Sequence, residues 1–466
     1  MQRKSASVLA FLSIAACSSE STTTAPPPPA ETQSDPNPPQ DQPPADQPPE
    51  ETAPPKPSFP HVVSRGGPVI TSPRIVPIVF KGDPMASQIE SFAKKLAGSS
   101  YWNSVTKEYG VGAISAGDMI TVDETPPENI MSSEIETWLT GKLTGTTPAF
   151  GAPDENTLYA VFYPTGTTIQ MENAGEYGQS CQGYGGYHFE IAPGTKKVGY
   201  AVLPRCGDID DLTVATSHEA FEWSTDPFPE SAPAFSKLDD EHWAWQATMI
   251  GELSDLCTFL DLDGLRPTEL GFKVQRHWSN MQSLAGTYPC APAKNVPYVQ
   301  IIGFPADDAS VPDYQLYNKY IHTKSFRVAP GKSATFELLA YSDRSISESI
   351  GMRAMSWQEL YGKPSDTGFT YDLDKGYAAV GDKVKLTIHA PTEANYDLLV
   401  LASGRVASGK WEGDVFYWPM LVTNDGGGGA TVTPNTMPKK PTGGTRYTSG
   451  TRMLRYSRSQ YTSSGR

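Results

Sequence analysis

The amino-acid sequence predicts an α+β fold, in which a domain built from a mixed sheet plus helices is followed by an all-β sandwich domain. In residues 61–292, apolar runs of strand length alternate with longer segments in which apolar residues recur every three or four positions. In residues 295–424, alternating runs are separated by turn residues such as Pro330 and Gly331. The first pattern is typical of strands packed on helices, and the second is typical of an antiparallel sandwich.

Within residues 61–292 the expected elements alternate between strand and helix. Pro77 lies in the first apolar run and predicts an edge strand or a bulge, because proline donates no hydrogen bond to a ladder. Gly98 interrupts the first helical pattern, and Ser133 and Glu136 have the spacing of a capping box. The expected strands cover residues 75–80, 119–122, 157–163, 186–191 and 198–203, and the expected helices cover residues 85–109 and 133–143.

A third helix, which follows the last of these strands, carries the most informative motif. Asp208 or Asp210 is suited to cap its N-terminus. His218 and Glu222 are four positions apart and therefore share one face of the helix, and Glu219 follows His218 directly. An imidazole and a carboxylate on one helix face are suited to hold a single metal ion.

This motif is similar to the zinc-protease helix H-E-x-x-H, with Glu222 in place of the second histidine. In a zincin-like site His218 and Glu222 would be metal ligands, and Glu219 would take a proton from a metal-bound water. A third ligand must come from further along the chain, where Glu252 and Asp255 lie on one turn of an expected helix. The motif therefore predicts a metallopeptidase-like hydrolase that binds zinc.

Other interpretations stay open on the residues alone. Calcium is the alternative cofactor, because it prefers carboxylate and carbonyl oxygens. The cleft could also bind a partner without metal, or the motif could be purely structural. His188 lies in a strand-like run, and we expect it to be a core histidine. The carboxylates of the all-oxygen alternative are Glu219, Glu222, Asp226, Glu252 and Asp255.

Three residues are expected to brace the site without taking part in its chemistry. Asp226 directly precedes Pro227, which ends the helix, so Asp226 is expected to cap or brace the final turn. Trp278 and Asn280 lie in a short polar and aromatic segment that also contains His277. The sequence does not choose between His277 and Asn280 as the residue nearer the site.

Residues 295–424 contain several runs typical of sandwich strands. We find no catalytic constellation among them, so this domain is expected to support the first or to bind a partner. The expected strands cover residues 298–302, 325–328, 334–341, 384–389, 398–402 and 416–422.

The N-terminus predicts export and a lipid anchor. Arg3 and Lys4 precede a short apolar stretch that ends in two alanines and Cys17, which is typical of a bacterial lipoprotein signal peptide covering residues 1–17. Lipidation of Cys17 would tether the chain to a membrane. Ser18 favours the outer membrane or cell surface in a cell with two membranes. The expected localisation is therefore the cell envelope.

Low-complexity segments flank the two expected domains. Residues 18–60 are rich in proline and predict a disordered stalk, and residues 425–466 are rich in glycine, serine, threonine and arginine and predict a disordered tail. The formal net charge of −15 argues against nucleic acid as a partner of the folded part. The expected partners are the membrane, through Cys17, and an extracellular peptide or cell-envelope polymer.

Four further cysteines are consistent with an oxidising compartment. They allow three pairings, and we predict the two that join neighbouring elements and bracket the motif. No C-x-x-C pair supports a zinc site made of all four. The predicted disulfides are Cys181–Cys206 and Cys257–Cys290.

A set of residues spread over 64–290 forms a recognisable pattern: residues 66–80, Cys181, His188, residues 204–206, Glu219, Glu222, and residues 225–227, 255–257 and 278–280. Through this pattern, residues 64–290 resemble secreted bacterial proteins that are distantly similar to the plant phosphate-induced (exordium) proteins. The resemblance implies an extracellular protein, linked in plants to growth and cell-wall responses. In plant members the position of His218 is not histidine, while both glutamates persist, which favours a carboxylate role. The alternative function is therefore a non-catalytic cell-surface or cell-wall binding protein with a zincin-like fold.

Overall fold

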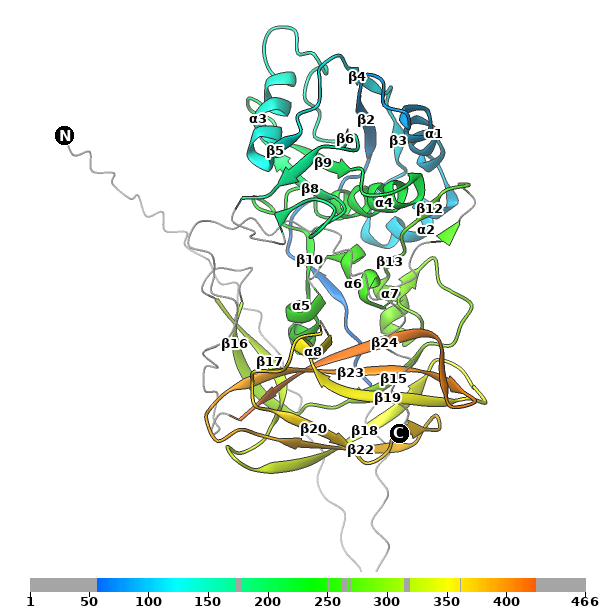
Figure 1. Ribbon diagram of the computed structural model, residues 1–466, viewed down its shortest axis with the longest axis vertical. Coiled ribbons are helices and arrows are strands. Elements are labelled where there is room, and N and C mark those ends of the chain that lie inside the picture. The colour runs from blue at the N-terminus through cyan, green and yellow to red at the C-terminus, as the bar shows by residue number, and fades with distance from the viewer. Residues whose placement is uncertain are drawn as a thin grey trace, which may run out of the picture. The chain divides into compact units, whose positions relative to one another are not determined.

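The computed structural model describes residues 57–172, 178–249, 252–260, 266–267, 270–313, 319–360 and 362–424. These residues form a mixed α+β fold that consists mostly of strands in several sheets, with few helices (Figure 1). The α+β prediction is confirmed at this level. None of the helices in these ranges has the length and apolar character needed to cross a membrane. The predicted signal peptide, most of the stalk and the tail lie outside the described residues.

A mixed sheet organises the N-terminal part. Its strands, in spatial order, are β3 (Ser115–Ala116), β2 (Arg74–Phe80), β6 (Thr157–Tyr163), β9 (Val198–Pro204) and β8 (Tyr187–Ile191), and β4 (Ile120–Val122) also pairs with β2. The strands β2, β6 and β9 are parallel, whereas β8 runs antiparallel to β9 at the edge. The five strands predicted from the sequence all belong to this sheet.

Pro77 lies inside β2, which has neighbours on both sides, so the prediction of an edge strand is wrong. On one side β3 pairs with β2 up to Ile75, and β4 pairs with it from Ile78 onward. The carbonyl of Ile75 accepts the N–H of Gly117 on this side, and residues two apart in a strand point the same way. The missing N–H of Pro77 therefore falls at the junction between two short neighbouring strands.

Helices cover both faces of the mixed sheet. The helices α1 (Ala86–Leu96) and α4 (Ile209–Thr225) pack on one face, and α3 (Ser132–Lys142) packs on the other. The first helical pattern is interrupted as predicted, because α2 (Ser100–Thr106) and a 3₁₀ turn follow α1 separately. The predicted capping box is wrong, since Glu134 accepts the N–H of Met131, while Glu136 accepts the hydroxyl of Tyr200.

Short helices and two-stranded pairs lie outside the larger sheets. The helices are α5 (Trp243–Met249), α6 (Leu253–Leu260) and α7 (Asn280–Leu284). The two-stranded pairs are β1 (Val62–Ser64) with β10 (Phe235–Leu238), β5 (Asn129–Met131) with β7 (Thr168–Gln170), β11 (Arg266–Pro267) with β12 (Lys273–Val274), and β13 (His277–Trp278) with β14 (Cys290–Ala291). Both predicted disulfides are confirmed, and Cys257–Cys290 joins α6 to β14.

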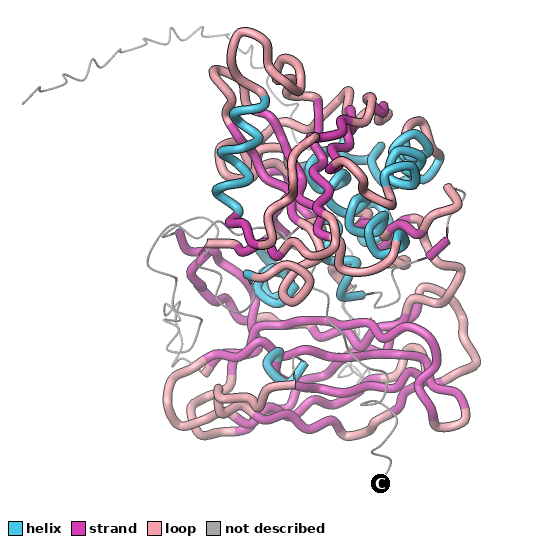
Figure 2. The backbone as a smooth tube through the Cα atoms, turned by 45° about the horizontal axis from the view of Figure 1, so that its top comes forward, coloured by secondary structure: helices cyan, strands magenta, loops and turns pink. Residues whose placement is uncertain are grey.

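Two larger sheets face each other in the C-terminal part (Figure 2). One has the order β15 (Val299–Gly303), β18 (Ser333–Ser342), β22 (Lys383–His389) and β20 (Thr370–Leu373). The other has the order β16 (Asp307–Asp313), β17 (Lys319–Arg327), β24 (Lys410–Thr423), β23 (Tyr396–Ala407), β19 (Ser349–Ser356) and β21 (Tyr377–Ala378), and the short helix α8 (Trp357–Leu360) follows β19. Sequence analysis missed β16, β19, β20 and β21.

Aromatic side chains of α5 and of the first described residues pack against the C-terminal sheets. Trp418 of β24 contacts the ring of Trp245 on α5 at a centroid distance of 5.4 Å. The ring of Phe59 contacts both Trp418 and Tyr341 and is buried. Phe59 belongs to the last four residues of the predicted stalk, so the packed chain begins before residue 61.

Candidate metal centre

The helix α4 is buried along most of its length. The carboxylate of Asp208 accepts the N–H groups of Asp210 and Asp211, which confirms Asp208 as the N-cap that the sequence suggested. Every residue from Leu212 to Thr225 is buried, because α4 lies between the mixed sheet on one side and β12 and α6 on the other. The polar side chains of the His-Glu motif are therefore removed from water.

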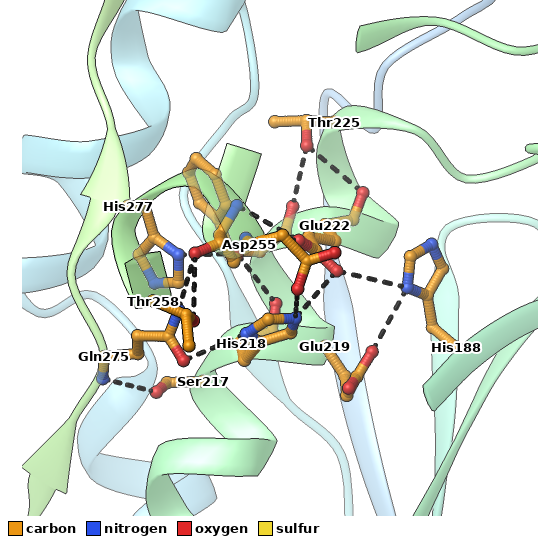
Figure 3. Close-up of polar contacts among 12 residues, drawn as sticks. His188, Ser217, His218, Glu219, Glu222, Thr225, Asp255, Thr258, Gln275 and His277 are labelled. Carbon is orange, nitrogen blue, oxygen red and sulfur yellow. Dashed lines mark hydrogen bonds and ion pairs between the residues drawn. The ribbon is translucent and has the colours of Figure 1, made fainter. Parts of the chain in front are cut away.

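The structure brings His218, Glu222 and Asp255 together. Nε2 of His218 lies 3.0 Å from Oε2 of Glu222 and 3.6 Å from Oδ1 of Asp255 (Figure 3). Ligand atoms around a tetrahedral zinc ion, with bonds of about 2.0–2.1 Å, are roughly 3.3 Å apart. The two observed separations from His218 lie on either side of this value, and the ligand atoms of all three residues lie within 4.8 Å of one another, so the group is suited to one zinc ion.

A chain of hydrogen bonds fixes which nitrogen of His218 faces the cluster. The amide nitrogen of Gln275 donates to the carbonyl of Ser254 at 2.7 Å and to Oγ1 of Thr258 at 3.0 Å. Its amide oxygen therefore faces Nδ1 of His218 at 2.9 Å and accepts a proton from it. In the neutral ring, Nε2 then carries a lone pair that points toward two carboxylates.

Glu222 presents its two oxygens to different partners. Oε1 accepts the N–H groups of Ser254 and Asp255 at 3.0 and 3.2 Å, at the start of α6. Oε2 faces His218, and neither Oε2 nor Nε2 of His218 has a hydrogen-bond partner among the described residues. Burial raises the pKa of Glu222 to about 7, against hydrogen bonds from Glu252, Asp255 and Ser254 that lower it.

Asp255, and not Glu252, is grouped with His218 and Glu222. Of the two candidates for the third ligand, Asp255 lies in the first turn of α6, whereas Glu252 precedes this helix. Glu252 is buried nearby, and its side chain hydrogen-bonds that of Glu222. The helix boundary thus separates two carboxylates that the sequence left equivalent.

His188 reaches the same cluster from the edge strand β8. Its Nδ1 lies 3.2 Å from Oε2 of Glu219 and 3.9 Å from Oε2 of Glu222. Burial, together with the nearby His218, lowers the pKa of His188 to about 3, against a hydrogen bond with the backbone of Asp226 that raises it. We expected His188 to be a core histidine; it is buried, but its ring faces two carboxylates of the motif.

His277 lies next to the cluster and hydrogen-bonds Ser254 of α6 and Tyr101 of α2. Tyr101 donates its hydroxyl to the carbonyl of Gln275 at 2.7 Å, so Nε2 of His277 must donate to Tyr101. Nδ1 of His277 then accepts from Ser254 at 2.7 Å, and the ring stacks on Phe221. Burial lowers the pKa of His277 well below its usual range, with a further contribution from His218. Both ring nitrogens are engaged, so His277 positions Ser254 and is no ligand.

The three residues expected to brace the site lie at its margins. Oδ1 of Asp226 accepts the N–H of Ala234 at 2.6 Å just beyond α4, as expected for a residue that braces the final turn. Asn280 bonds to Val62 of β1 and accepts the indole N–H of Trp278. Among the described residues, no hydrogen bond or ion pair links Trp278 or Asn280 to the cluster.

The donor set favours zinc over calcium. Each group of donors that could hold an ion contains one histidine, and nitrogen ligands are typical of zinc, whereas calcium takes oxygen ligands. The exposed fractions are 0% for His218 and Glu219, 1% for Glu222 and 4% for Asp255. Sequence analysis missed Gln275 and Ser254, because no residue pattern marks a side chain that orients a ligand.

Comparison with known proteins identifies no family for this chain. No family model matches it, and no curated protein matches it either. Among solved structures, domains 4 and 5 of the S-layer protein SbsC match at 12% identity and a TM-score of 0.16, over 25% of this chain and 60% of that one. The MSP family member WR4 of C. elegans matches at 12% identity and a TM-score of 0.16, over 21% of this chain and 90% of that one. The MSP-domain protein SSP-19 of Caenorhabditis elegans matches at 14% identity and a TM-score of 0.16, over 21% of this chain and 94% of that one.

Proposed function

We propose that this chain is a zinc-dependent hydrolase-like protein of the cell surface, acting on peptide bonds. The observation that carries the proposal is the pair formed by Nε2 of His218 and Oε2 of Glu222. These atoms are buried and 3.0 Å apart, and neither has a hydrogen-bond partner among the described residues. Two electron-rich atoms repel each other at this distance unless a cation or an extra proton lies between them.

Zinc, when bound, would polarise a substrate carbonyl and lower the pKa of a bound water. The residues of the chain have separate tasks. His218, Glu222 and Asp255 would hold the ion, and Gln275 keeps a proton on Nδ1 of His218 so that Nε2 can bind. Glu219, next to His218 on α4, would accept the proton of the attacking water.

The arrangement of elements supports a zincin-like domain followed by a sandwich. A mostly parallel sheet with one antiparallel edge strand lies against the helix that carries the motif, and this edge strand, β8, contributes His188. The two facing sheets after residue 298 supply the proposed sandwich. These features agree with the zincin analogy drawn from the sequence. They do not assign the chain to a family.

We place the protein in the cell envelope, tethered by a lipid at Cys17, with an extracellular peptide or a cell-envelope polymer as the substrate class. The two disulfides support an oxidising compartment, since such bonds are rare in the cytosol. The lipoprotein signal and the exordium resemblance remain predictions from the sequence.

The burial of the donors favours a second candidate function. With exposed fractions of 0–4%, the four residues are less accessible than an open catalytic site requires. A metal in such a place would stabilise the fold of a non-catalytic binding protein. Exchange of Glu219 for glutamine separates the two functions. A hydrolase keeps the ion of the His218 group and loses turnover, whereas a binding protein has no turnover to lose.

Metal content tests the proposal directly. The purified full-length protein should contain zinc by plasma mass spectrometry, and the His218→Ala variant should lose it. His389→Ala is the matched control, because its side chain is 40% exposed on β22, in the C-terminal sheets. Calcium that is unaffected by His218→Ala would favour the all-oxygen alternative. Absence of any metal, together with unchanged stability in chelator, would refute the metal centre.

A further inference from the structure

The cluster around Glu222 contains two groups of ligand atoms, and the metal centre proposed above uses only one of them. The first group is His218, Glu222 and Asp255, and the second is His188, Glu219 and Glu222. Within each group the ligand atoms lie within 4.8 Å of one another. The groups come from α4, α6 and β8, and they share Glu222 alone.

The second group has spacings that suit a metal ion as well as the first. Nδ1 of His188 lies 3.2 Å from Oε2 of Glu219 and 3.9 Å from Oε2 of Glu222. These separations lie on either side of the roughly 3.3 Å expected between ligands of a tetrahedral zinc ion. His188 therefore has the geometry of a ligand in its own right.

One ion does not account for both histidines. Among the described residues, no group of three donors within 4.8 Å of one another contains His188 and His218 together. Ligands of a single zinc ion are closer than this, at roughly 3.3 Å. The contacts drawn in Figure 3 run from the carboxylate of Glu222 to each histidine separately.

The charge of the cluster also exceeds what one divalent cation balances. Four buried carboxyl groups, those of Glu219, Glu222, Glu252 and Asp255, carry a charge of −3 when one proton is shared in the hydrogen bond between Glu222 and Glu252. The partners of Glu219 and Glu222 include histidine rings, backbone N–H groups and the side chains of Ser254 and Glu252. Buried charges require compensation, and a second divalent cation would supply the charge that one ion leaves unbalanced.

We propose that this site is a two-metal centre in which Glu222 is the bridging carboxylate, His218 and Asp255 complete the first ion's ligands, and His188 and Glu219 complete the second's. This inference rests on the proposed function, because it presupposes the first ion. Paired ions in hydrolytic sites are about 3.5–4 Å apart, a distance that one carboxylate can bridge. Glu219 would bind through Oε2, which leaves Oε1, beside Gly186, as the proton acceptor.

The stoichiometry of zinc binding tests the inference. The metal-depleted full-length protein is titrated with zinc in competition with a chromophoric chelator. The wild type should bind two equivalents, His188→Ala and Asp255→Ala one each, and Glu222→Ala none, while the control His389→Ala keeps two. If His188→Ala fails to fold by circular dichroism, His188→Asn retains a polar side chain of smaller size.

The outcomes separate this inference from the proposed function. One equivalent in the wild type, retained by His188→Ala and lost in His218→Ala, overturns the second ion and leaves the first intact. No zinc binding in the wild type overturns both proposals. Cobalt(II) gives an independent readout, because two ions about 3.5–4 Å apart couple magnetically and weaken the paramagnetic resonance signal per ion. A full, uncoupled signal in the wild type at saturation would also refute the pair.

Discussion

Exchange of Gln275 for methionine should weaken zinc binding without touching a metal ligand. Methionine has a similar length and no hydrogen-bonding amide. The substitution removes the acceptor of Nδ1–H of His218 at 2.9 Å, together with the donor to the Ser254 carbonyl at 2.7 Å and to the Thr258 hydroxyl at 3.0 Å. The Ser254 carbonyl keeps the hydroxyl of Thr258 at 3.4 Å, so the buried imidazole N–H is the group that loses its partner.

The expected magnitudes follow from this single lost partner. One buried donor without an acceptor costs about 1–3 kcal/mol, and the free energy of unfolding of the metal-free protein should fall by this amount. The proton is then no longer held on Nδ1 and can move to Nε2, the atom that must bind the ion. Loss of such an orienting partner typically lowers metal affinity about 10- to 100-fold.

Urea unfolding in chelator and zinc competition titration measure the two effects on the same variant. Gln300→Met is the matched control, because Gln300 is also fully buried and its amide nitrogen donates to Tyr298 and to the carbonyl of Tyr417. Gln300→Met should lose a similar amount of stability and keep the zinc affinity of the wild type. Equal zinc affinities in the two variants would refute the orienting role of Gln275.

Three further predictions concern stability. Serine at Cys257 and Cys290 should lower the free energy of unfolding by about 3.7 kcal/mol, the chain-entropy value for a separation of 33 residues, as measured by urea titration. Alanine at Gly199 would place its side-chain carbon 1.9 Å from Nε1 of Trp223, and this overpacking should cost about 1–3 kcal/mol in the same assay. Burial raises the pKa of Asp397, so folding favours the protonated form of this carboxyl group. The protonated carboxyl group therefore stabilises the fold fully below pH ~4, the ordinary pKa of an aspartate, and this stabilisation is lost as the pH rises through the pKa of the folded state. Asp397→Asn should abolish this decline, and a wild-type stability that rises with pH relative to the variant would contradict the assignment.

The sequence predicted those parts of the site that depend on local chemistry. Asp208 caps α4 because its carboxylate reaches N–H groups two and three residues ahead, and this spacing can be read from the sequence. His218 and Glu222 meet because helix geometry places i and i+4 on one face. The disulfide pairs also followed from the order of neighbouring elements.

The remaining parts depend on contacts between distant segments. His188 meets Glu219 only because β8 pairs antiparallel to β9 at the sheet edge, a strand order that no periodicity reveals. Gln275 orients His218 across 57 positions of sequence. The edge-strand prediction for Pro77 failed for the same reason, since two short strands share one side of β2.

A cluster of carboxylates tends to separate, so in the metal-free protein other forces must hold together the segments that carry them. The disulfide Cys257–Cys290 ties α6, which carries Asp255, to β14. The disulfide Cys181–Cys206 ties the segment before β8 to the residues after β9. Both links thus constrain the two segments that meet α4 at Glu222, and they lower the entropy that metal binding would otherwise have to offset.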